Sequence, residues 1–194
     1  MSSSTKKLTG LALLTAIVVV LQYLGSFVHI GPFAVSLVLI PIVVGAAVFG
    51  PGAGAYLGGV FSAVVIIASV TGADQGGALY WNANPLGMVL VVAIKGIAAG
   101  WCAGVVYRAL EEKNETLATV LAAIVCPVVN TGLFLLGSFT VVRGLLEQMA
   151  GGSDLILFAM TGLVGINFIA ELVTNLVLSP VIVRILHAVS VRSR

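Results

Sequence analysis

The chain has 194 residues, of which 60% are hydrophobic and only 8% are charged. A soluble domain carries about 25% charged residues, so these charges are too few to cover a water-facing surface. The composition therefore excludes a soluble domain and predicts an integral membrane protein. The net charge is +2, with basic residues at the ends of apolar runs, which gives no case for nucleic-acid binding.

Six apolar runs follow one another along the chain and, with their connections, nearly use up its length. Because a helix that crosses about 30 Å of hydrocarbon needs roughly 20 residues, no further span fits. We expect residues 1–194 to form one all-α domain, a bundle of six transmembrane helices. The runs are 8–27, 35–49, 53–70, 85–108, 117–136 and a last one that begins at 155 or 161 and ends at 186.

The connections between these runs include two polar segments. Residues 71–84 are rich in glycine and amides, and we expect a loop there. Residues 137–153 are predicted to form a loop with an interfacial helical piece.

Basic residues near helix ends set the orientation of a membrane protein, because cytoplasmic loops carry the excess. With six spans, Arg143 lies alone on one side. The other side holds Lys6, Lys7, Arg108, Lys113, Arg184, Arg192 and Arg194. We therefore expect both termini in the cytoplasm of a multi-pass protein of the cell membrane.

Polar side chains recur at one depth of the predicted bundle. An ionisable residue inside a span costs about 2.5–3.5 kcal/mol on insertion scales and marks a functional site by default. Lys95 lies about 15 Å from the outer end of the fourth helix, and the fifth and sixth helices bring amides to a similar depth. We predict that a small polar solute enters from outside and is bound here. The candidate substrate-binding residues are Lys95, Asn130, Thr131, Asn167, Glu171, Asn175, Trp81, Asn82 and Asn84.

Other interpretations of these residues stay open at this point. Lys95 and Glu171 are also suited to a structural ion pair between two helices, and asparagines often join helices by hydrogen bonds. Trp81 is equally typical of the aromatic belt at a membrane surface.

Three common catalytic or nucleotide-binding motifs are absent. The sequence lacks a P-loop, an H-E-x-x-H and a G-x-S-x-G pattern. The two histidines are predicted on opposite sides of the membrane, and both cysteines lie inside apolar runs. We expect no metal site, no cofactor and no enzymatic activity.

Several features together resemble a known family. They are the Ala12-x-x-x-Ala16 pair, the turn Phe49-Gly-Pro-Gly-Ala-Gly54, and the segments 84–96, 126–131 and 167–180. Over nearly its whole length, the chain resembles the substrate-binding S components of energy-coupling factor (ECF) vitamin transporters. The three segments are similar to the group that includes folate, pantothenate and riboflavin carriers.

The resemblance implies a mechanism and partners. An S component binds a vitamin from outside and docks on a membrane coupling protein through the first-helix alanines, here Ala12 and Ala16. Two ATPase subunits then power toppling of the S component in the lipid bilayer. Lys95 suits a carboxylate, which favours pantothenate over the other candidates, namely folate, biotin, lipoate and riboflavin. Glu171 complicates this choice, because a neutralised Lys95 leaves a site for an uncharged ligand.

Two other functions are compatible with the residues alone. One is a stand-alone channel or secondary carrier, although the cytoplasmic half lacks a polar track. The other is a membrane-embedded enzyme that uses Lys95 and Glu171.

Overall fold

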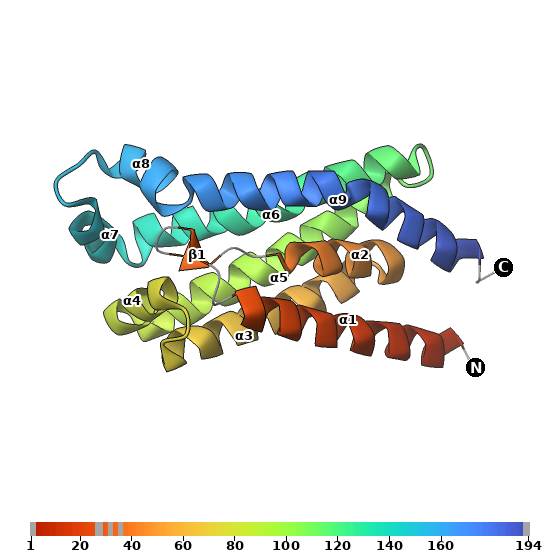
Figure 1. The fold of residues 1–194 in the computed structure, drawn as a ribbon, viewed down its shortest axis with the longest axis horizontal. Helices are drawn as coiled ribbons and strands as arrows, with labels where there is room; N and C mark the ends of the chain where they lie inside the picture. Colours follow the sequence, from red (N-terminus) through yellow and green to blue (C-terminus); the bar gives the residue numbers. More distant parts are fainter. Residues whose placement is uncertain (1–2, 26–28, 31–32, 35–36, 192–194) are drawn as a thin grey trace.

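The computed structural model describes residues 3–25, 29–30, 33–34 and 37–191, and nearly all of them are helical (Figure 1). Two short strands, β1 (His29–Ile30) and β2 (Phe33–Ala34), form an antiparallel pair. Arg192 and Arg194, which were counted for the orientation, lie outside the described residues. The helices are α1 (Ser3–Gly25), α2 (Leu39–Phe49), α3 (Pro51–Thr71), α4 (Gln75–Ala83), α5 (Pro85–Leu110), α6 (Glu115–Thr140), α7 (Arg143–Ala150), α8 (Leu155–Phe158), the π-helix η1 (Ala159–Leu163) and α9 (Gly165–Val191).

The expectation of an all-helical membrane bundle is confirmed, but six spans are not clearly present in the described part of the chain. Four helices, α1, α3, α5 and α6, are long and apolar enough to cross a membrane. A fifth candidate is α8 and η1 together with the first part of α9, which are bent by 45°. The remaining apolar helix, α2, has 11 residues and is only about 16 Å long. It is too short to cross the hydrocarbon by itself.

The short helix α2 lies at the centre of the bundle. It packs against α1, α3, α5, α6 and α9. Leu39, Ile42 and Val43 are completely buried, as expected for a helix that is apolar on every side. In Figure 1, α2 lies toward the end of the bundle where α1 begins and α9 ends.

The closest helix packing joins α3 to α5 through small residues. A side chain on Gly54 or Gly58 would collide with the backbone of Gly100 or Gly96. Farther along α5, a β-carbon on Gly104 would lie 2.6 Å from the Pro51 α-carbon. Gly96, Gly100 and Gly104, which are four residues apart in α5, therefore let two helix backbones touch, as small residues do in membrane helices.

The opposite end of the bundle carries more helix than the sequence predicted. The connection 71–84 was expected to be a loop, but it contains α4. The segment 137–153 contains the expected helical piece, α7, and α6 continues to Thr140. The Asn84 side chain accepts a hydrogen bond of 2.9 Å from Gly87 N–H at the start of α5. This cap and Pro85 in the first turn explain why a new helix begins there.

Candidate functional site

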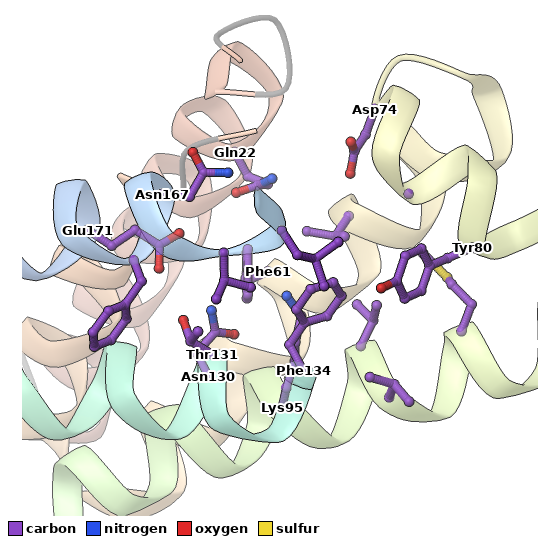
Figure 2. A pocket seen from close by; sticks show the side chains of 18 residues that line it. Gln22, Phe61, Asp74, Tyr80, Lys95, Asn130, Thr131, Phe134, Asn167 and Glu171 are labelled. Carbon is purple, nitrogen blue, oxygen red and sulfur yellow. The ribbon is translucent and has the colours of Figure 1, made fainter. Parts of the chain in front are cut away.

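A polar cavity lies between the helices at the end of the bundle that carries α4 (Figure 2). Its volume of about 80 Å³ is enough for several water molecules, because one water needs roughly 10–15 Å³. Six α-helices, the π-helix η1, the residue between η1 and α9, and the connection before α4 contribute to its wall. The lining residues are Gln22, Phe61, Val65, Asp74, Gly77, Tyr80, Met88, Val91, Val92, Lys95, Asn130, Thr131, Phe134, Leu163, Val164, Asn167, Phe168 and Glu171.

The wall of this cavity contains no residue of α2. Because α2 fills the axis of the bundle over only a short length, the surrounding helices enclose a space beyond its N-terminal end. The side chains that face this space come from helices that are far apart in sequence. The site is therefore a product of the whole bundle.

The Lys95 ammonium lies between two aromatic rings. Its Nζ is 5.0 Å from the ring centre of Phe134 and 5.6 Å from that of Phe61. Cations within about 6 Å of a ring centre are attracted by its π face. Within the described part of the chain Lys95 forms no salt bridge, so the ion pair with Glu171, considered above as a structural alternative, is not formed.

Two carboxylates face the same cavity. Asp74 is 7% exposed and Glu171 is 5% exposed, and Figure 2 shows them on different sides of the space. Asp74 precedes α4, where its backbone oxygen accepts a hydrogen bond of 2.9 Å from Ala78 N–H. Its side-chain Oδ1 is buried and has no hydrogen-bond partner among the described residues.

Amide groups complete the polar part of the wall. Asn130 on α6 is buried, and its Oδ1 also has no hydrogen-bond partner in the part of the chain that the structure describes. Gln22 on α1 and Asn167 on α9 are buried and face the cavity in Figure 2. Thr131 beside Asn130 is partly buried. The cavity thus presents both hydrogen-bond donors and acceptors to a solute.

Tyr80 attaches α4 to α6 at the edge of the cavity. Its hydroxyl and the Ser138 hydroxyl share a hydrogen bond of 2.9 Å, and its ring stacks on Phe134 with ring centres 5.3 Å apart. Burial raises the pKa of Tyr80 to about 12, and the hydrogen bond to Ser138 partly opposes this shift. Tyr80 is therefore neutral at physiological pH and can donate a hydrogen bond.

Five of the nine candidate residues from the sequence line this one cavity: Lys95, Asn130, Thr131, Asn167 and Glu171.

The other four candidates lie outside the lining. Asn175 is buried one turn farther along α9, where its Nδ2 donates to the Glu171 backbone oxygen at 2.8 Å. Trp81 packs against the main apolar core, Asn82 is exposed, and Asn84 caps α5.

Sequence reasoning missed three polar lining residues, Gln22, Asp74 and Tyr80, as parts of the site. A signal existed for Gln22, because it is an amide near the end of an otherwise apolar run. Asp74 and Tyr80 belong to a segment that was expected to be a solvated loop. Their burial depends on the fold of α4 against α3, α5 and α7.

The two alanines predicted to dock a partner lie on an exposed face of α1. Ala12 and Ala16 are both exposed, as are the larger neighbours Leu13 and Ile17. This face meets lipid or another protein in the membrane.

A comparison of the sequence with protein families covers almost the whole chain. A family model for the ECF transporter, substrate-specific component, matches residues 6–183. The chain belongs to this family of S components, which are integral proteins of the prokaryotic plasma membrane and are transporter subunits, not enzymes. They bind small-molecule substrates and act with a transmembrane T component and ATPase subunits. No curated protein matches the sequence, so no relative indicates a particular substrate.

Proposed function

We propose that this chain captures a vitamin-like solute from outside the cell in the cavity between α4, α5, α6 and α9, as the substrate-binding subunit of an ECF-type importer. The observation that carries this proposal is the cavity itself. It brings a lysine, two carboxylates and three amides together in a chain with only 8% charged residues. Buried polar groups in a membrane protein are costly, and they mark substrate sites.

The orientation follows from the placement of charge. The cavity lies at the end of the bundle that carries Arg143, while Arg108 and Lys113 lie near the opposite end (Figure 1). The positive-inside bias assigns that opposite end to the cytoplasm, which gives an N-in/C-in topology. We propose that the chain crosses the membrane six times, with α2 as part of the second crossing.

The described residues favour a partner-dependent mechanism over a channel. In the part of the chain that the structure describes, the cytoplasmic half contains the apolar α2 and the close contact of α3 with α5, which oppose passage of a polar solute from the cavity toward the cytoplasm. A bound solute then leaves inward only if the whole subunit changes its position. We propose that a coupling protein docks at Ala12 and Ala16 and that two ATPase subunits drive this toppling.

On the sequence alone, Lys95 favours pantothenate as the ligand. In the structure Lys95 shares the cavity with Asp74 and Glu171, so a carboxylate on the ligand is no longer the simplest partner. Pantothenate, folate, biotin, lipoate and riboflavin belong in the first binding panel, together with cationic vitamins.

Reconstitution in liposomes tests the proposed function. The compound that the purified chain binds should enter liposomes only when the coupling protein, both ATPase subunits and ATP are present. Uptake by the chain alone would contradict the proposal and indicate a secondary carrier. Chemical conversion of the compound by the chain would indicate an enzyme.

A further inference from the structure

We infer that the cavity is selective for a small organic cation, a solute with a protonated amine or a comparable cationic N–H group, and that Asp74 accepts a hydrogen bond from it. This inference rests on the proposed function and names the substrate class of the same site.

The first argument is the charge balance of the cavity wall. Among its 18 lining residues, the charged side chains are Asp74, Glu171 and Lys95, so two negative groups face one positive group. An unbalanced charge in a low-dielectric site is unfavourable, and a ligand of opposite charge removes the imbalance. A monocation brings the formal total to zero, whereas a ligand with one carboxylate doubles the excess negative charge.

The second argument is the position of Lys95. Its Nζ is held near the faces of Phe61 and Phe134, so the rings stabilise the ammonium from within the protein. Lys95 thus offsets one of the two carboxylates as part of the wall.

The third argument is the hydrogen-bonding state of the acceptors. The buried Oδ1 atoms of Asp74 and Asn130 both lack a hydrogen-bond partner among the described residues, and both residues line the cavity. An ionised carboxylate can only accept hydrogen bonds, and leaving a buried acceptor unsatisfied costs about 1–3 kcal/mol. The N–H groups of a protonated amine satisfy Asp74. A carboxylate on the ligand offers only more acceptors.

The site of the cationic group follows from the position of Asp74. It lies on the connection between α3 and α4, and Figure 2 shows its carboxylate on the side of the cavity away from Glu171. Gly77 in α4 allows this placement, because a β-carbon there would lie 2.7 Å from Asp74 Oδ2. The cationic end of the solute therefore lies at the α4 side of the cavity, and the rest extends toward Thr131 and Asn167.

A binding panel with matched charges tests the inference on the full-length purified chain. Pyridoxamine, pyridoxine and 4-pyridoxate share one ring and present a cationic, a neutral and an anionic group, and thiamine, pantothenate and biotin extend the panel. We expect binding by calorimetry for a cationic member, with affinity at least about tenfold above every neutral or anionic compound, which corresponds to about 1.4 kcal/mol. Tightest binding of a neutral compound or a carboxylate overturns the inference but leaves solute capture intact. No binding of any compound, and no molecule retained in native mass spectrometry, overturns both.

A pair of isosteric variants assigns the effect to Asp74. Asp74→Asn removes the charge and should lower the affinity of the cation at least about tenfold. Asp154→Asn is the matched control, because Asp154 is exposed, caps α8 at Leu157 N–H, and can be replaced by asparagine as a cap. It should bind like the wild type. Wild-type affinity in Asp74→Asn contradicts the inference.

A second pair of variants covers the case in which Asp74→Asn is poorly folded. Glu171→Gln should also weaken cation binding, whereas Glu112→Gln, on the exposed α5–α6 connection, should not. Unchanged or tighter binding in Glu171→Gln also overturns the charge argument.

Discussion

The two halves of this bundle differ in what fills the space between the outer helices. In one half, α2 occupies the axis, and the backbone of Gly54 meets that of Gly100. In the other half α2 is absent, and polar side chains from α1, α5, α6 and α9 face a cavity. The length of one central helix therefore decides where this very apolar chain can bury polar groups.

The same comparison explains why an S component needs a partner. The half with α2 is closely packed and apolar, which makes it a barrier to a polar solute. The half with the cavity contains the polar groups that we propose to bind the solute. A chain built in this way is suited to hold a solute on one side of the membrane and is poorly suited to release it on the other side without outside work.

The closely packed half is the most sensitive to a large side chain. Gly100→Leu should lower the free energy of unfolding by about 3 kcal/mol, because the new side chain meets the Gly54 backbone and lies against Ile42 of α2. Thermal unfolding in detergent measures the effect. The control Gly132→Leu faces open space and should leave stability nearly unchanged. Equal stability of both variants would show that the α3–α5 contact is not tight.

The exposed face of α1 should affect transport but not binding. Replacing Ala12 and Ala16 together by leucine should lower ATP-driven uptake about tenfold or more, because bulky residues separate the two proteins at a small-residue contact. Calorimetry on the isolated chain should give the wild-type affinity. The control Ala63→Leu makes the same exchange at one exposed position of α3 and should leave uptake unchanged. Normal uptake by the Ala12/Ala16 variant would move the docking surface elsewhere.

The cavity half should be sensitive to the loss of single polar groups. Asn130→Ala should weaken ligand binding about fivefold to tenfold, in line with the loss of about one hydrogen bond. Asn82→Ala removes the same amide from an exposed position outside the lining and should have no effect on affinity. If the two variants bind equally well, the ligand does not contact the α6 wall of the cavity.

The smallest expected effect is a change in the pH dependence of stability, which depends on Tyr80 at the edge of the cavity. Its pKa rises from 10.0 in a model peptide to about 12 in the folded chain, so the folded state holds the phenolic proton more tightly than the unfolded state. The stability that this provides is complete below pH 10 and is lost as the pH rises from 10 to about 12. Tyr80→Phe should remove this part of the pH dependence. The free energy of unfolding, measured against pH for the wild type and for Tyr80→Phe, should fall more steeply in the wild type between pH 10 and about 12. Identical slopes of the two chains in this pH range would contradict this expectation.

The sequence predicted the helical membrane bundle because its apolar runs have the length of membrane spans. It also placed Lys95, Asn130 and Glu171 at one depth, because residue number along a helix converts directly into distance. The structure brings these residues to one cavity.

The sequence could not show the central position of α2 or the burial of Asp74. A short apolar run does not reveal that five other helices surround it, because that depends on contacts between distant segments. Asp74 lies in a polar connection that resembles a solvated loop, and only the packing of α4 turns it toward the cavity. Both features depend on tertiary contacts, which a single sequence does not reveal.

Native mass spectrometry of two neighbouring tryptophan variants tests the central claim most directly, since one position fills the cavity and the other does not. Thr131 lines the cavity, whereas Gly132 faces open space. The account predicts one bound small molecule per chain in the wild type and in Gly132→Trp, and none in Thr131→Trp. A wild-type chain without a bound molecule, or a Thr131→Trp chain that retains it fully, would contradict the account.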